Sequence, residues 1–224
     1  MRFGNDDLSP YDMVDMGHDV AKGCAYLQDM QFVHGDLAAR NVLLCDNPIK
    51  SCRLIAKVAD YGLSKDFTEL YKVKYTKENR VQIPWKWMAI EYLRDDYFTL
   101  TSDVWSFGVV IWEILSFGKM PYGPVGFEEL MEKFDEGYRL PFPTEAKKFT
   151  YWSADQFYTR ITEKCFIEDP NERSTFTEIV KMIEKELSEK EIKEYRLFQE
   201  KHEAIHRNNY ISHKTTQVDN QLLK

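Results

Sequence analysis

The sequence predicts a mainly α fold with short β hairpins, and three observations support this class. Apolar residues recur at three- and four-residue intervals over residues 13–27, which is typical of a helix with one face in a core. Residues 102–117 are almost continuously apolar, which indicates a helix buried on most of its surface. Short runs with the composition of strands lie at 32–34, 42–44 and 54–58.

The first expected helix has a clear start signal. Ser9 offers a cap, Pro10 suits the first helical position, and Asp12 places a carboxylate in the first turn. After this helix, the turn signal at residues 46–48 separates the second and third strand runs and predicts that they form a hairpin. The apolar stripe of the helix consists of Met13, Met16, Val20, Cys24 and Leu27.

Two further helices are expected over 127–136 and 154–165, with loop prolines between and after them. A final amphipathic helix is expected to begin near Thr175. Because charge replaces the apolar stripe toward its end, the chain divides into a folded unit, 1–186, and a charged helix with a polar tail, 187–224.

The charged stretch at 187–203 alternates Lys and Glu, which is typical of a solvated helix face rather than a binding site. His202 and His206 are four residues apart and could share a metal ion on a helix. No third ligand follows at a matching spacing, so a metal site is not expected there.

The composition limits the classes of protein to which the chain can belong. At 224 residues, 43% apolar and 30% charged, the chain has the balance of one globular unit or slightly more. No apolar run approaches the roughly 18 to 20 residues that span a bilayer, and no secretion leader is evident, so a soluble chain is expected. A net charge of −7 argues against a general nucleic-acid binder. The cysteines show neither metal-ligand pairing nor a disulfide framework and are expected to be reduced in a cytosolic setting: Cys24, Cys45, Cys52 and Cys165.

The most informative stretch is His-Gly-Asp-Leu-Ala-Ala-Arg-Asn at residues 34–41. A carboxylate at Asp36 and an amide at Asn41 can face one small site from a single turn-rich loop. A second carboxylate, Asp60, follows the strand run 54–58 and precedes Tyr-Gly. By itself, a strand that ends in Asp followed by Gly more often marks a plain turn.

Three further motifs follow in order: Pro-Trp-Lys-Trp-Met-Ala-Ile-Glu at 84–91, Ser-Asp-Val-Trp-Ser-Phe-Gly at 102–108, and residues 165–176. Together the motifs resemble the catalytic domain of protein tyrosine kinases, of receptor-like type. The forms Leu-Ala-Ala-Arg-Asn and Pro-x-Lys-Trp-Met-Ala are those of tyrosine-specific members. The resemblance covers most of the unit 1–186 and implies the kinase C-lobe, the larger helical lobe.

This resemblance also implies an activity, which is transfer of the ATP γ-phosphoryl group to tyrosine hydroxyls of protein substrates with the help of Mg²⁺. Such a transfer needs a carboxylate that orients the hydroxyl or accepts its proton, together with groups that hold the metal. The implied site residues are Asp36, which orients the hydroxyl or accepts its proton; Arg40, which supports charge near the substrate; Asn41 and Asp60, which hold magnesium; and Leu43 and Ala59, which form the floor under the adenine ring.

Four residues are implied to support this site. His34 belongs to the loop itself, and the carboxylate of Asp103 is expected to accept hydrogen bonds from the loop backbone. The other interpretation of Asp103 is that it only caps its helix. Glu91 and Arg173 are expected to form an ion pair that pins the end of the activation segment, and such a pair is costly to break from one side if it is buried.

Regulation is suggested by tyrosines in the segment that corresponds to the kinase activation loop. Tyr75 precedes Pro84 by nine residues, where receptor-type kinases carry a phosphorylated tyrosine, and Tyr71 is a second candidate. Both could instead be ordinary half-buried aromatics. Gly35 replaces an arginine that grips the phosphorylated loop in most members, which is expected to weaken that switch. Phosphotyrosines such as Tyr210 would recruit proteins that read them.

The small β lobe of the family, with its glycine-rich phosphate cover and strand lysine, has no counterpart in this sequence, since only 33 residues precede His34. One hypothesis is a truncated tyrosine kinase that is inactive alone. It would be cytoplasmic, or at the cytoplasmic face of the plasma membrane if its parent is a membrane-anchored receptor. A second is a non-catalytic lobe that binds or scaffolds other proteins. A third is a helical interaction protein that acts through 187–203.

Overall fold

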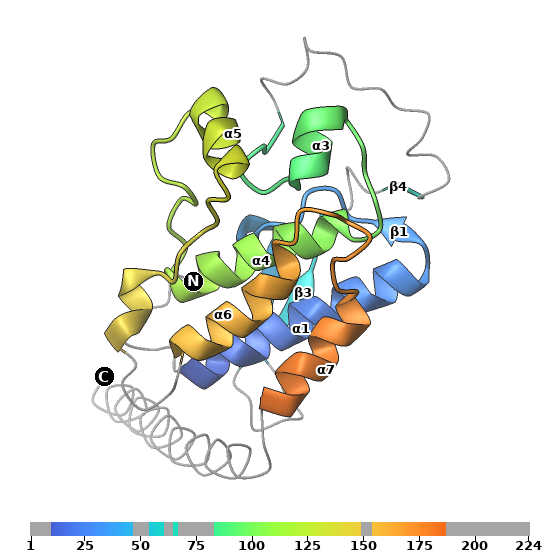
Figure 1. Cartoon of the computed structure of the whole chain (residues 1–224). Coiled ribbons are helices and arrows are strands. Elements are labelled where there is room, and N and C mark those ends of the chain that lie inside the picture. Colours follow the sequence, from blue (N-terminus) through green and yellow to red (C-terminus); the bar gives the residue numbers. More distant parts are fainter. Residues whose placement is uncertain (1–9, 47–53, 61–64, 67–82, 149–153, 187–224) are drawn as a thin grey trace, which may run out of the picture.

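A computed structural model of the chain describes residues 10–46, 54–60, 65–66, 83–148 and 154–186. Within these ranges the chain forms a group of helices and two small sheets (Figure 1). In chain order, with η for a 3-10 helix, the elements are α1 (Pro10–Asp29), β1 (Phe32–Val33), η1 (Ala39–Asn41), β2 (Val42–Asp46), β3 (Leu54–Val58), β4 (Lys65–Asp66), α3 (Ile90–Asp95), α4 (Ser102–Leu115), α5 (Phe127–Asp135), η4 (Thr144–Lys148), α6 (Ala154–Cys165) and α7 (Phe176–Glu186).

Helix α4 is the central element of the fold. Its aromatic residues Trp105 and Phe107 are fully buried, and the helix packs against both α1 and α6. Helix α7 packs against α1 and α6, so these four helices enclose one apolar core (Figure 1). The prediction of a helix buried on most of its surface over 102–117 is confirmed, and the helix ends at Leu115.

Helix α1 begins at Pro10, as predicted from the proline at the first helical position. Gly17 lies on its face toward α4, where an added Cβ would come within 2.7 Å of Ile111 Cδ1. A glycine there lets the two helices approach closely. The predicted apolar stripe of α1 faces the core, with Met13, Met16, Val20 and Cys24 buried and Leu27 half-buried.

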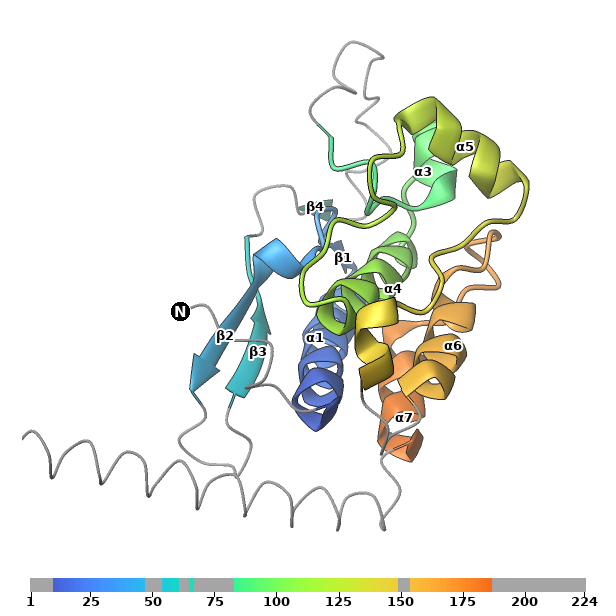
Figure 2. The ribbon, with the colours of Figure 1, turned by 90° about the vertical axis from the view of Figure 1, so that its left-hand side faces the viewer.

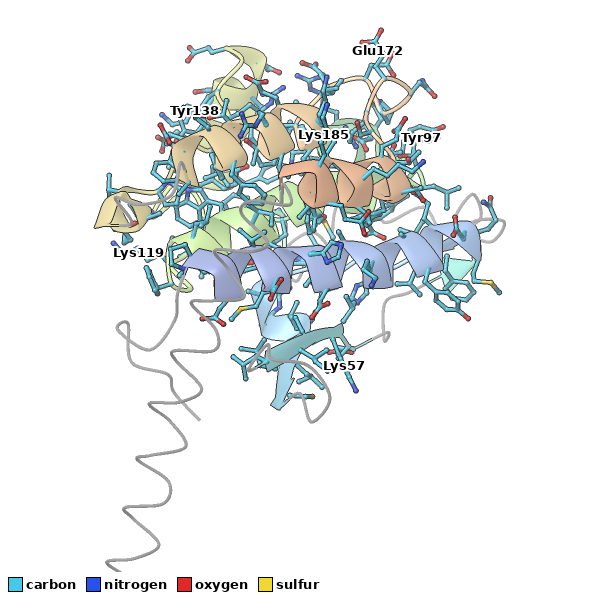
Figure 3. The ribbon with its side chains drawn as sticks, turned by 90° about the horizontal axis from the view of Figure 1, so that it is seen from below. Lys57, Tyr97, Lys119, Tyr138, Glu172 and Lys185 are labelled. Atoms are coloured by element: carbon cyan, nitrogen blue, oxygen red, sulfur yellow. The ribbon has the colours of Figure 1, made fainter. Side chains whose placement is uncertain are left out.

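Strands β2 and β3 form the predicted antiparallel hairpin, in a register that pairs Val42 with Val58 and Leu44 with Ala56. The hairpin lies on the opposite side of α1 from α6 and α7 (Figure 2). In Figure 3, Lys57 marks the hairpin on one side of α1 and Lys185 marks α7 on the other. A hydrogen bond from the Ala56 amide to Asp19 Oδ2, 3.1 Å long, ties the hairpin to α1.

Several short elements were not predicted from the sequence, β4 and α3 among them, whereas β1 lies within the predicted strand run 32–34. The two-residue strand β1 pairs with β4 in a second small sheet, and β4 is too short to leave a periodic pattern. Helix α3 is six residues long and also falls below the length at which helical periodicity becomes visible. Among the described helices, none has both the length and the apolar character needed to cross a membrane.

Candidate functional site

The 34–41 loop connects β1 to β2 and ends in η1, and it brings Asp36 and Asn41 into direct contact. Asn41 Nδ2 donates to the Asp36 carbonyl at 2.7 Å and to Asp36 Oδ2 at 2.9 Å. Because both of these partners are acceptors, they assign the amide nitrogen and leave Oδ1 as the acceptor end of the group. The loop therefore presents a carboxylate and an amide oxygen from adjoining positions.

His34 is fully buried and links this loop to the residue before Asp60. Its Nδ1 accepts a hydrogen bond from the Asp36 amide at 3.3 Å, and its Nε2 lies 3.1 Å from the Ala59 carbonyl. An acceptor at Nδ1 and a carbonyl at Nε2 fit the neutral imidazole with its proton on Nε2. The Ala59 amide also donates to the Asn41 carbonyl at 2.8 Å.

These contacts bring the second predicted carboxylate next to the loop. Asp60 follows Ala59 directly, is exposed, and has φ 63°, in the left-handed region that Asp tolerates better than most residues. The described residues contain no group of three His, Cys, Asp or Glu side chains placed to hold a metal ion. The candidate metal donors are those that the resemblance implies, the amide of Asn41 and the carboxylate of Asp60.

Asp103, in the first turn of α4, holds the start of the loop. Its Oδ2 accepts a hydrogen bond from the His34 amide at 2.5 Å, and its Oδ1 accepts one from the Gly35 amide at 3.0 Å. Burial raises the pKa of Asp103, while the two donated N–H groups lower it in part. Thr101 is the residue at the helix cap, so the interpretation that Asp103 only caps α4 is wrong.

Glu113, near the other end of α4, holds the end of the loop. Its Oε2 accepts hydrogen bonds from the Ala39 amide at 2.9 Å and from the Trp87 indole Nε1 at 2.8 Å. Burial raises the pKa of Glu113, and its hydrogen-bond donors and Arg40 lower it in part. Sequence reasoning gave Glu113 no role. The available signal was a carboxylate inside an apolar helix, which needs partners when buried.

Arg40, near the end of the 34–41 loop, contacts both Asp36 and the segment that carries Trp87. It forms an ion pair with Asp36, and its guanidinium lies 4.6 Å from the centre of the Trp87 ring. The Ser106 hydroxyl donates to the Trp87 carbonyl at 2.7 Å, so α4 also fixes the backbone at Trp87. The predicted catalytic pair, Asp36 and Arg40, is thus in direct contact.

Glu91 and Arg173 form the ion pair expected from the resemblance. Arg173 Nη1 and Nη2 each lie 2.8 Å from a different oxygen of Glu91. The arginine also donates to the carbonyls of Ile167 and Thr101, and the Ser102 hydroxyl donates to Glu91. Both side chains are buried, so the pair ties the start of α3 to the loop before α7.

The other predicted residues are placed as follows. Leu43 on β2 is 56% exposed, and Ala59 is half-buried just after the paired strand. Gly35 has φ 76°, a left-handed conformation that glycine adopts without steric cost. Tyr71, Tyr75, Tyr210, the histidine pair and the charged stretch 187–203 lie outside the described residues.

A family model described as protein tyrosine and serine/threonine kinase matches residues 1–183. The chain belongs to this kinase family. Among curated relatives, the kinase chain is 41% identical over 167 residues to tyrosine-protein kinase receptor Tie-1 of Danio rerio, covering 75% of the chain and 80% of that protein. It is 38% identical over 183 residues to the angiopoietin-1 receptor of Danio rerio, covering 82% of the chain and 15% of the receptor.

A third relative of this kinase chain is tyrosine-protein kinase FRK of Homo sapiens. The identity is 39% over 163 residues, which cover 73% of the chain and 30% of that protein. The chain therefore spans most of the Tie-1 sequence but less than a third of the angiopoietin-1 receptor and of FRK. The predicted resemblance to tyrosine kinases and the expected C-lobe fold are confirmed.

Proposed function

We propose that this protein is a protein tyrosine kinase that transfers the γ-phosphoryl group of ATP to tyrosine hydroxyls of protein substrates in signal transduction. The observation that carries the proposal is the joint placement of Asp36, Arg40 and Asn41. One carboxylate contacts both a guanidinium and an amide, and the loop that carries all three is anchored to α4 at both ends. Such preorganisation suits a reaction that depends on positioning and electrostatics.

The loop residues supply the steps that fall to the protein. The Asp36 carboxylate accepts a hydrogen bond from the substrate hydroxyl, orients its oxygen, and can take its proton. Arg40 balances the charge of Asp36 and of an approaching phosphoryl group. Asn41 holds the Asp36 backbone and carboxylate in one orientation through its two donated hydrogen bonds. His34 keeps the Ala59 carbonyl, and so Asp60, beside the loop.

The donor set fits magnesium and ATP. Asn41 Oδ1 and the Asp60 carboxylate are hard oxygen donors of the kind that Mg²⁺ prefers. When bound, the metal would neutralise charge on the phosphate oxygens. The exposed Leu43 side chain and the neighbouring Ala59 provide an apolar surface suited to a flat adenine ring.

The test is magnesium-dependent phosphorylation of a tyrosine peptide by the purified chain. We expect Asp36→Asn to lower the rate at least about 100-fold, the lower range for a lost acid–base group. Asp155→Asn makes the same change at an exposed position of α6 and should leave the rate unchanged. Transfer that survives Asp36→Asn would contradict the proposal. A folded wild-type chain that transfers no phosphate would agree with the hypothesis of a kinase that is inactive alone.

The exposure of Leu43 favours one other function, a non-catalytic kinase lobe that binds partner proteins through its open hairpin face. A folded chain without transfer activity that binds a partner, with binding lost in Leu43→Ser, would support it. For the kinase, the expected partners are tyrosine-containing substrates and proteins that read phosphotyrosine. The proposed location is the cytoplasm, or the cytoplasmic face of the plasma membrane for a receptor parent.

A further inference from the structure

The buried carboxylate of Glu113 contacts two separate segments, although no role was predicted for this residue from the sequence. It is 7% exposed and accepts two hydrogen bonds on the same oxygen, from the Ala39 amide and the Trp87 indole. These donors come from segments 48 positions apart in the sequence, 39 and 87, so the carboxylate joins the 34–41 loop to the 84–91 segment. A buried carboxylate with these partners fixes the indole ring in one orientation.

The indole that Glu113 fixes is the surface on which Arg40 rests. The guanidinium lies 4.6 Å from the centre of the Trp87 ring, and its charge acts on Glu113 as well, lowering the pKa of that buried carboxyl in part against the effect of burial. The same guanidinium forms the ion pair with Asp36. A continuous chain of contacts therefore runs from Glu113 on the central helix, through Trp87 and Arg40, to Asp36, the proposed catalytic carboxylate.

This chain of contacts matters because the guanidinium of Arg40 would otherwise be only weakly fixed beside Asp36. Its side chain is 44% exposed, and an exposed ion pair by itself contributes little stability. Ordering a long arginine side chain costs conformational entropy of similar size. The ring face of Trp87 and the negative charge of Glu113 supply the additional attraction that keeps the guanidinium beside Asp36.

We propose that Glu113 and Trp87 are positioning residues that hold Arg40 against Asp36, so that the placement of the 84–91 segment is coupled to the charge beside the catalytic carboxylate. This inference rests on the proposed function for the role of Asp36. Arg40 is stacked on Trp87 and paired with Asp36 only while the indole ring stays in place. A shift of Trp87 would release the guanidinium to solvent.

The experiment follows the δ-methylene protons of Arg40 by NMR in the full chain, because stacking on an indole displaces these resonances upfield. Trp87→Leu should abolish the displacement, whereas Trp87→Phe keeps a ring face and should retain most of it. Glu113→Gln keeps an acceptor oxygen but removes the charge. It should lower the stacked population by up to about fivefold, because the attraction between the guanidinium and the carboxylate charge is lost. Trp112→Phe is the matched control.

Trp112 lies on α4, next to Glu113 in the sequence, and its indole donates to the Pro141 carbonyl at 3.0 Å. Its replacement should therefore leave the Arg40 resonances unchanged. The proposal is overturned if the displacement persists in Trp87→Leu or stays at the wild-type value in Glu113→Gln. If Glu113→Gln does not fold, the contrast between the Leu and Phe variants of Trp87 decides the question.

Phosphoryl transfer by the same variants separates this inference from the proposed function. A wild-type chain without transfer, but with the expected pattern of Arg40 shifts, would show that this chain is inactive alone and would keep the positioning of Arg40. With transfer detected, the proposal expects Glu113→Gln to lower kcat with little change in KM for ATP. An unchanged kcat in this variant would reject the coupling to Asp36.

Discussion

Two arginine–carboxylate pairs in this lobe have the same chemistry and opposite surroundings. Arg173 and Glu91 are buried, with side-chain exposures of 0% and 8%, and meet through two contacts of 2.8 Å. Arg40 and Asp36 meet at the surface, with exposures of 44% and 16%. The first pair is suited to hold two segments together, and the second is suited to meet a ligand.

The difference lies in how much of each charge the protein itself satisfies. Arg173 donates to the carbonyls of Ile167 and Thr101 as well as to Glu91, which leaves little capacity for another partner. Arg40 reaches Asp36 through Nη2, and 44% of its side chain stays exposed to solvent. A buried, saturated pair cannot exchange partners cheaply, whereas an exposed pair can.

The largest expected effect comes from breaking the buried pair. Arg173→Met should lower the free energy of unfolding by about 3 to 5 kcal/mol, because it leaves the Glu91 carboxylate buried without its partner. Urea denaturation measures the loss. Arg94→Met is the control, since Arg94 pairs with Glu168 and Asp135 at the surface and should cost no more than about 1 kcal/mol. Equal losses in both variants would refute the contrast.

A smaller loss is expected where α4 holds the loop that carries the open pair. Asp103→Asn places an amide donor opposite one of the N–H groups of His34 and Gly35 and leaves one of them unsatisfied. The expected cost is about 1 to 3 kcal/mol in the free energy of unfolding. The same change at exposed Asp155 should cost much less, and a comparable loss there would argue against the anchoring role.

The backbone of the same loop supplies a third test. Gly35→Ala should cost about 1 kcal/mol, because φ is 76° and a Cβ is strained in this region. Gly35→Asn is the control at the same site, since Asn tolerates the left-handed region better and should cost less. Thermal unfolding compares the two. A larger loss for Asn than for Ala would show that space, rather than φ, selects glycine here.

The smallest effect on stability is expected at the open pair itself. Arg40→Met should change the free energy of unfolding by less than about 1 kcal/mol, because the ion pair is exposed. Added salt should shrink this difference further, since exposed charges are screened. Denaturation at low and high ionic strength measures it. A loss as large as that of Arg173→Met would remove the distinction between the two pairs.

Much of the helical framework could be predicted from the sequence. The expected helix at 154–165 and the strand at 54–58 match α6 and β3 at both ends, and the helix expected at 127–136 ends one residue early. Long periodic segments carry their own signal, because each apolar position reports the face that is buried. The predicted strand run 32–34 contains β1, but its partner β4 and helix α3 are too short for such a signal, and their formation depends on neighbouring segments.

The sequence by itself determined the family, because the motifs and their order can be recognised from the residues alone. It also identified Asp36, Asn41 and Asp60 as the candidate site. The resemblance also implied that Asp103 holds the start of the 34–41 loop. Only the tertiary structure decided that Glu113 holds the end of this loop and that Glu113 and Trp87 support Arg40. Contacts between residues dozens of positions apart are set by the packing of whole helices, and no local pattern in the chain records them.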